Sequence, residues 1–354
     1  MKVFLVKIYV SLINFKDNKL PFYFTKTPFL ASLYYLIFST KFRRENHAVI
    51  NGKVEHLKKL KKEKNNIYTL IRNTHRLEKG LLMRPRKGVY ALNYIEETVD
   101  SFIHIWKPSK MKEDEQYKWF YDVLSEYFET SSENQLIEAL FNKFKTFIKT
   151  STDDELVVSN NSTKKIPYKR ILEMKPNISY EDFYNLNRYR RSVRWFLNKK
   201  VPRGDVDLAI RAANQSPSAC NRQPYHYKVI DEPALLKKVS SLPGGVRGYE
   251  KGIPMMIVVV GNLDAYFDER DRHIIYIDAS LANMTLMLAL ETLNLSSCSI
   301  NWPDVEHLEK QMQKTLNLKP NQRPVMCIAI GYPDPEGKVA FSEKRDLNYI
   351  RSYN

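Results

Sequence analysis

The stretch Arg190-Arg-Ser-Val-Arg194, followed by Ser216-Pro-Ser-Ala-Cys-Asn-Arg-Gln-Pro-Tyr225, decides how the rest of the chain is interpreted. The first segment crowds Arg190, Arg191, Ser192 and Arg194. Guanidinium groups bind phosphate through paired hydrogen bonds, and a serine hydroxyl adds a neutral donor. A second basic pair, Lys344-Arg345, is expected to close the same site. The second segment is a loop of turn formers and small polar residues. Together the two segments suit a ligand with an anionic tail and a flat, hydrogen-bonding head.

Helices and strands alternate around this stretch. Residues 180–190 and 206–213 are predicted helices, and residues 225–230, 254–260 and 324–330 are predicted strands. The segment 276–295 is apolar on nearly every face of a predicted helix, so it is expected to be buried centrally or in a subunit interface. This order predicts a layered α+β sheet domain over residues 178–354.

Residues 1–150 are predicted to be mainly helical, and residues 151–177 form a polar linker. Aromatic residues at helical spacing in 117–128 and 136–148 are interpreted as core. The charged cluster 75–79 precedes Gly80 and has two interpretations. It is either a charged helix end capped by glycine, or a polar cluster that faces the second domain or its ligand. The spacing leaves both open.

Composition excludes several classes of protein. The hydrophobic fraction of 43% supports packed cores, and 354 residues favour two domains. The net charge of +16 is interpreted as a lysine-rich surface, with no nucleic-acid partner, because no helix-turn-helix, zinc-finger or RNP-like motif accompanies it. Three scattered cysteines predict neither a disulfide framework nor a zinc site and favour a reducing cytoplasm. The histidines show no metal-ligand spacing, and neither a Walker loop nor Gly-x-Gly-x-x-Gly is present.

The apolar, aromatic segment 27–40 lies between Lys26 and Lys41. It is shorter than the roughly 20 residues that a membrane-spanning helix needs. Aromatic residues beside lysines suit a membrane interface, so peripheral membrane contact is one interpretation. The favoured interpretation is a helix packed on its own domain.

From about residue 180 to the end, the chain resembles the nitroreductase family of flavin enzymes. Four motifs carry the resemblance, in the order and spacing of the family. They are Arg190–Arg194; Ser216–Tyr225, which matches Ala-Pro-Ser-x-x-Asn-x-Gln-Pro-Trp; the predicted helix and turn of 279–302; and Gly331-Tyr-Pro followed by Lys344-Arg345. The resemblance implies a three-layer sheet domain flanked by helices. Residues 75–81 resemble, more weakly, a helical extension found on some nitroreductase-like proteins.

The resemblance also implies a homodimer that holds one FMN per site at the subunit interface. Arg190 with Lys344 or Arg345 would bind the FMN phosphate. Ser192 and Arg194 would contact the phosphate or the N1/O2 edge of the flavin ring. Asn221 would hydrogen-bond the edge of the isoalloxazine ring. Further cofactor-binding residues are then Arg191, Pro217, Ser218, Gln223, Ser299, Ile300 and Asn301. NADH or NADPH would deliver hydride to flavin N5, and an electron-poor small molecule would accept it. The chain then supplies position and charge, and neither a catalytic side chain nor a metal site is predicted.

The chain departs from the family at the run Asn294–Asn301, which replaces a Gly-Leu-Gly-x-Cys-x-Ile-Gly turn near flavin N5. Asn294 and Asn301 can replace glycine because asparagine tolerates left-handed backbone. Ser296 is a poorer replacement, which predicts altered geometry at the turn. Cys220 and Cys298 have two interpretations, a reactive thiol and a small packing residue, and packing is the favoured one.

The sequence supports three hypotheses for the function of this chain. The leading one is an FMN-dependent oxidoreductase that uses NAD(P)H. The second is a flavin-binding or vestigial module that serves interaction, or assembly of a biosynthetic complex, through its helical half. The third is a biosynthetic dehydrogenase for a carrier-bound or saccharide intermediate, whose helical half receives the substrate.

Overall fold

Strand β2 (Met255–Asn262) is buried along its whole length and lies inside a four-stranded antiparallel sheet of order β1-β2-β4-β3. The computed structural model describes residues 2–151 and 163–354, so residues 152–162 of the predicted linker lie outside the described residues. The other strands are β1 (Tyr225–Ile230), β3 (Ser296–Asn301) and β4 (Gln322–Gly331). The predicted strands correspond to β1, β2 and β4.

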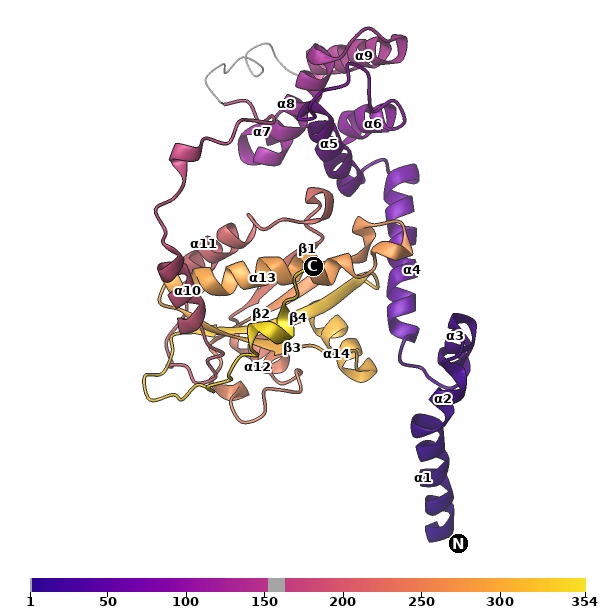
Figure 1. Cartoon of the computed structure of the whole chain (residues 1–354), viewed down its shortest axis with the longest axis vertical. Helices are drawn as coiled ribbons and strands as arrows, with labels where there is room; N and C mark the ends of the chain where they lie inside the picture. The colour runs from indigo at the N-terminus through magenta and orange to yellow at the C-terminus, as the bar shows by residue number, and fades with distance from the viewer. Residues whose placement is uncertain (1, 152–162) are drawn as a thin grey trace.

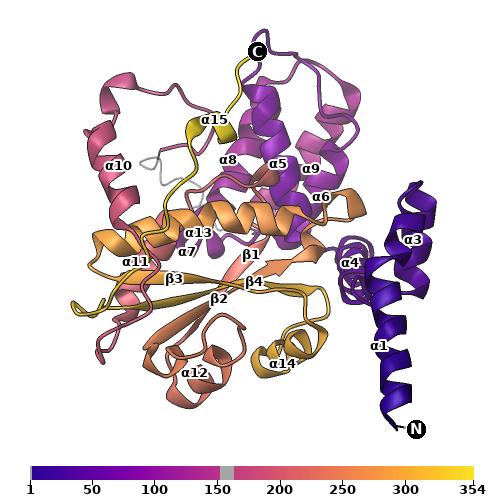
Figure 2. The same ribbon diagram turned by 60° about the horizontal axis from the view of Figure 1, so that its bottom comes forward.

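Side chains alternate across β2, and each face is covered by helices (Figures 1 and 2). Met256, Val258 and Val260 pack towards α12 (Pro233–Ser240) and α14 (Glu306–Leu316). Met255, Ile257 and Val259 pack towards α11 (Arg203–Ala213) and α13 (Ile274–Thr292). This is the predicted α+β domain with three layers, and α10 (Tyr180–Tyr189) precedes it.

One helical stretch in the described part of the chain, Glu269–Thr292, is long and apolar enough to cross a membrane, judged by length and composition. It includes α13, whose side chains Ala279, Ala282 and Leu286 are buried against the sheet. The prediction that this helix is buried is therefore confirmed for the face on the sheet. Its opposite face is exposed.

A second core lies in the amino-terminal half. It is formed by α5 (Ile67–Leu81), α6 (Ile95–Ile105), α8 (Glu115–Thr130) and α9 (Gln135–Ser151), and the short helix α7 (Lys110–Glu113) precedes α8. Phe120, Tyr127 and Phe144 are buried there, and Phe102 stacks on Trp106. The interpretation of the aromatic stripes as core is confirmed. Beyond α9, the described part of the linker holds only one turn of 3-10 helix, Leu172–Met174 (η2).

Helix α4 (Arg43–Leu57) joins the two halves. It packs on Leu263–Ala265 (η5), directly after β2. Asp264 is the centre of this junction: its carboxylate accepts hydrogen bonds from Lys59 at 2.6 Å and from Asn321 at 2.9 Å. His56 Nδ1 lies 2.8 Å from the Asp264 carbonyl oxygen, and burial lowers the pKa of this histidine.

The helices α1 (Lys2–Asn18), α2 (Leu20–Phe24) and α3 (Pro28–Ile37) project away from this body (Figure 1). Helix α3 has no buried residue. The favoured interpretation of 27–40, a helix packed on its own domain, is therefore wrong. The apolar side chains of α3 contact the arm itself and otherwise face outward.

Gly52 permits the close packing of α4. A Cβ atom at this position would lie 2.6 Å from the Leu263 Cβ atom and 2.8 Å from the Leu263 carbonyl carbon. We predict that Gly52→Ala lowers the free energy of unfolding by about 1–3 kcal/mol, because α4 must shift away from Leu263 of η5. Gly204→Ala in α11 is the control, since nothing lies within 4 Å of its Cβ position. Urea denaturation of the two variants checks this, and equal midpoints would contradict it.

Candidate cofactor site

The segment 190–197 lies along the edge of the sheet. Ser192 forms a parallel bridge with Ser297 of β3, and the Val193 amide donates to the Ser297 carbonyl at 3.1 Å. The Leu197 amide donates to the Tyr332 carbonyl at 2.9 Å, just beyond β4. Because side chains alternate along extended backbone, Arg190, Ser192 and Arg194 share one side of the segment. The first motif thus forms a row of two cations and a hydroxyl.

Buried polar atoms without partners gather at the start of this row. Arg190 Nε, Ser297 Oγ and Glu291 Oε1 are buried and have no hydrogen-bond partner within the described chain. Buried polar groups are paired in the great majority of cases, so these atoms indicate a ligand or a second chain. An unpaired guanidinium nitrogen beside a row of cations fits an anion such as a phosphate.

Arg191 contacts the carboxyl-terminal tail, since its guanidinium donates to the carbonyl oxygens of Ala340 and Phe341. Lys344 and Arg345, a few residues further along the tail, are exposed. The Arg345 guanidinium lies over the Tyr349 ring, 5.4 Å from its centroid. Arg191 therefore attaches the tail to the cation row, and cofactor contacts by Arg191, Lys344 and Arg345 remain predictions.

The second motif forms a tight loop around η3 (Ala219–Asn221). Cys220, Asn221 and Gln223 have positive φ angles of 53°, 56° and 49°. Left-handed backbone costs about 1 kcal/mol or more for residues other than glycine, and several such residues in one loop are typical of a functional site. Gln223 Nε2 donates to Asn221 Oδ1 at 3.0 Å, and the Gln223 amide donates to Ser218 Oγ at 3.1 Å. Pro217 is exposed at the start of the loop.

The two motifs lie at opposite ends of α13. The Ala219 amide donates to Asp278 Oδ2 at 2.9 Å, in the early part of the helix. Glu291, in its last turn, lies close enough to Arg190 for the two charges to interact. Thirteen residues separate Asp278 and Glu291, which corresponds to roughly 20 Å of helix. One chain therefore does not bring Arg190 and Asn221 to the same place.

The run Asn294–Asn301 is mainly a strand rather than a turn, because β3 pairs with β4 from Ser296 onwards. Asn294 has a φ of 57°, as the glycine replacement predicted. Ser296 needs no left-handed backbone: it is buried and donates to Glu291 Oε2 at 3.1 Å. Ser296 therefore causes no backbone strain in the strand, and altered geometry near flavin N5 remains a prediction. Asn301 lies exposed at the end of β3 and has no positive φ angle.

The remaining residues of this run and the two cysteines differ in burial. The Ile300 side chain is buried in the core beneath the sheet, so a ligand could reach this residue only through its backbone, while Ser299 is half-buried. Cys298 packs in the same core as Ile300, as its packing interpretation predicted. Cys220 is half-buried in the η3 loop.

A cavity of about 930 Å³ opens between the two halves of the chain. The second domain contributes four amide side chains, and the helical half and residues 163–168 contribute charged and aromatic groups. The lining residues are Glu78, Asp114, Glu115, Gln116, Trp119, Thr163, Lys164, Lys165, Ile166, Tyr168, Asn214, Gln215, Asn221 and Gln223. Sequence reasoning missed Trp119 and Tyr168, because one lay within a presumed core stripe and the other within the linker.

The two interpretations of the cluster at 75–79 both apply in part, because the cluster lies near the end of α5 and one of its residues reaches the cavity. Helix α5 lies beside the η3 loop, and Glu78 lines the cavity together with Asn221. His75 Nδ1 lies 3.4 Å from Glu78 Oε2. Gly80 lies inside the last turn of α5 and permits close packing, since a Cβ atom there would lie 2.0 Å from the Tyr90 ring. Glu78 therefore faces the second domain, whereas Arg76 lies over the Tyr94 ring within the helical half.

The three-layer fold and its row of cations define a domain suited to an anionic cofactor. Residues 188–243 and 251–332 match the model of the nitroreductase family. This part of the chain is therefore a nitroreductase-family domain, which supports a flavin-dependent oxidoreductase, and a helical half precedes it.

Relatives of known sequence and structure are distant. The chain is 22% identical over 227 residues to iodotyrosine deiodinase 1 of Sus scrofa, covering 56% of this chain and 78% of that protein. It is 25% identical over 175 residues to an iodotyrosine deiodinase of Thermotoga neapolitana, covering 43% of this chain and 88% of that protein. An FMN-dependent nitroreductase from Clostridium difficile has a TM-score of 0.42 and 23% identity, covering 48% of this chain and 99% of that one.

Burial raises the pKa of Glu291 to about 7, although the Ser296 hydroxyl and Arg190 act to lower it. The folded protein therefore holds a proton that the unfolded chain releases near its ordinary pKa, and stability falls as the pH rises between these two values. We predict that Glu291→Gln flattens this decline, by up to about 1.4 kcal/mol per pH unit. Urea denaturation from pH 4 to 8 measures it, with the exposed Glu336→Gln as control. Parallel profiles of wild type and Glu291→Gln would contradict the prediction.

Proposed function

We propose that this chain is an FMN-dependent oxidoreductase of the reducing cytoplasm. It would take hydride from NADH or NADPH and pass electrons to an electron-poor small molecule. The observation that carries the proposal is the buried, unpaired Arg190 Nε at the head of the Arg190–Ser192–Arg194 row, within a nitroreductase-family domain. Bound FMN would supply a ring that accepts hydride and then gives up two electrons.

The residues present fit such a cofactor. Arg190 and Ser192 would hold the phosphate, with Lys344 or Arg345 closing over it from the tail. Arg194 is exposed, and its guanidinium hydrogen-bonds the nearby Ser192 carbonyl at 3.3 Å and contacts the Tyr249 hydroxyl. Its remaining N–H groups would be available to the ligand. A fixed cation near the N1 edge would favour the negative charge of a reduced ring. Asn221 and Gln223, oriented by their mutual hydrogen bond, would hold the ring edge.

A homodimer would complete this site. Between the two motifs, α13 exposes Ile277, Leu281 and Met284, which are 53%, 46% and 37% accessible. These positions follow helical spacing and form an apolar stripe. A twofold interface pairs the same surface of both subunits. A second copy on this stripe, with its α13 antiparallel, would place the Arg190 row of one subunit beside the Asn221 loop of the other.

The cavity supports a role for the helical half in choosing the acceptor. It begins at Asn221 and Gln223, and its far wall comes from α5, α8 and residues 163–168. Its amides, carboxylates and aromatic rings can bind a polar organic molecule, as a biosynthetic dehydrogenase would require. The vestigial-module alternative rested partly on the lost glycines, and Ser296 gives it no support, because β3 is regular at that residue.

The function is tested by the colour and reduction of the purified protein. We predict that the full chain binds FMN and that NADH or NADPH bleaches its flavin absorbance under anaerobic conditions. Arg190→Ala should weaken FMN binding by about 1.5–3 kcal/mol, the scale of a charge-assisted hydrogen bond. Protein that cannot be loaded with FMN would overturn the proposal. If the protein binds FMN but neither NADH nor NADPH reduces it, only the proposal that NAD(P)H is the hydride donor would be overturned.

Mixing two inactive variants tests whether subunits share the site. When the Arg190→Ala and Asn221→Ala variants are refolded together in equal amounts, half of the dimers contain one subunit of each variant. If each site takes residues from both subunits, such a mixed dimer has one intact site and one damaged site. We therefore predict that the mixture recovers about a quarter of the wild-type high-affinity FMN sites. Each variant refolded alone is the control. No recovery, with mixed dimers verified by differential tags, would place the whole site within one chain.

A further inference from the structure

The segment from Lys2 to Phe42, called the amino-terminal arm below, stands apart from both cores (Figures 1 and 2). Its attachment is α4, where Arg44 donates hydrogen bonds to Glu306 and Gln313 of α14. The proposed redox site requires none of its residues. The arm therefore calls for an explanation of its own.

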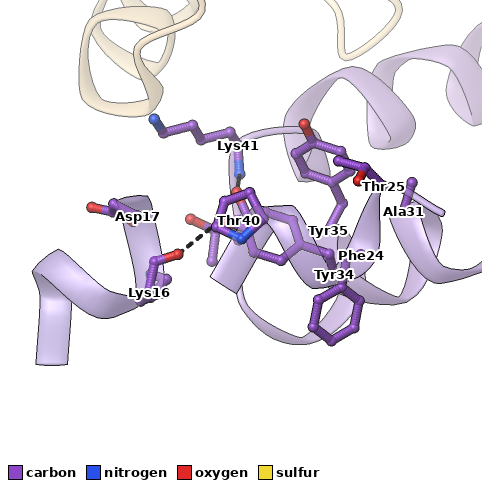
Figure 3. A pocket seen from close by; sticks show the side chains of 11 residues that line it. Lys16, Asp17, Phe24, Thr25, Ala31, Tyr34, Tyr35, Thr40 and Lys41 are labelled. Carbon is purple, nitrogen blue, oxygen red and sulfur yellow. Dashed lines mark hydrogen bonds between the residues drawn. The ribbon is translucent and has the colours of Figure 1, made fainter. Parts of the chain in front are cut away.

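The arm has an internal structure. Phe24, Tyr34 and Phe38 form a cluster with ring centroids 5.6–6.0 Å apart, and Tyr35 packs edge-on against Phe42 at 4.5 Å. The Tyr34 hydroxyl donates to the Lys16 carbonyl at 3.4 Å, which ties α3 to the end of α1 (Figure 3). A hollow of about 310 Å³ lies between these helices. The arm is thus a folded unit that presents a defined surface.

That surface is unusually apolar. Phe22, Phe29 and Leu36 are 75%, 75% and 71% accessible. Further exposed large apolar residues of the arm are Phe4, Leu5, Val6, Tyr9, Phe15, Tyr23, Tyr35, Ile37 and Phe42. Exposed large apolar side chains in this number mark a site of contact with a protein or a membrane.

The charge of the arm distinguishes between a protein partner and a membrane. The arm carries six lysines, at positions 2, 7, 16, 19, 26 and 41, and a single acidic residue, Asp17, which gives a net charge of +5. Lysine is depleted in protein–protein interfaces. On an anionic membrane, each lysine near the surface contributes about 1 kcal/mol, and aromatic rings favour the depth of the lipid headgroups. The combination favours lipid.

Length decides how the arm would lie. Helix α3 has 10 residues and α1 has 17, and α1 is interrupted by Lys7. A spanning helix needs about 20 consecutive apolar residues, so neither fits across a bilayer. We propose that the amino-terminal arm docks flat on an anionic lipid surface, with its aromatic side chains among the headgroups and its lysines at the phosphates.

Vesicle sedimentation of the full chain tests this. We expect binding to vesicles of phosphatidylglycerol and phosphatidylcholine, at least tenfold weaker binding to phosphatidylcholine alone, and weakening with salt. The triple variant Phe22→Ser, Phe29→Ser, Leu36→Ser should lose at least tenfold in affinity for the anionic vesicles. Lys16→Gln, Lys19→Gln, Lys26→Gln should lose the preference for anionic lipid.

A matched triple variant, Ile171→Ser, Leu172→Ser, Met174→Ser, removes three exposed apolar side chains outside the arm and should keep full binding. Circular dichroism and thermal unfolding verify that each variant is folded. Absence of binding to anionic vesicles, or equal binding by the arm triple variant, would overturn the proposal. The proposal would also be overturned if the wild type formed an oligomer that did not bind vesicles and that the arm triple substitution dissociated. The arm would then cover a second copy of the chain.

Discussion

Burial of β2 on both faces is the constraint on which the second half of this protein depends. All eight residues of the strand are buried, so each set of alternate side chains needs its own layer of helices. Helices α11 and α13 form one layer, and α12 and α14 form the other. With both faces covered, the open edge of β3 is where the Arg190 segment joins the sheet. The cation row thus lies at the rim of a rigid core.

The junction at Asp264 gives the amino-terminal half its position. This buried carboxylate directly follows β2 and accepts hydrogen bonds from Lys59 and Asn321. A buried charge is costly unless it is paired, so the interaction specifies one arrangement of α4 on the sheet. Helix α5 follows and carries Glu78 to the η3 loop. The cavity between the halves results from this arrangement rather than from either half alone.

Helix α13 separates the two motifs of the candidate site and also offers a way to reunite them. It is long because it spans the sheet, so the cation row and the Asn221 loop lie at its opposite ends. Its outer stripe, Ile277, Leu281 and Met284, is exposed between them. The same helix thus supplies core packing on one side and an exposed apolar stripe on the other, which is why it is apolar on nearly every face.

The sequence by itself determined the α+β class, strands β1, β2 and β4, the helical amino-terminal core and the left-handed backbone at Asn294. These depend on local periodicity and on the tolerance of asparagine for positive φ. Tertiary structure alone decided that β3 is a strand, that Ser296 is unstrained, and that Arg191 contacts the tail. It also placed Arg190 and Asn221 far apart, brought Trp119 and Tyr168 into one cavity, and left α3 without a domain to pack on. Each of these depends on contacts between residues distant in the chain, and such contacts leave no local periodicity.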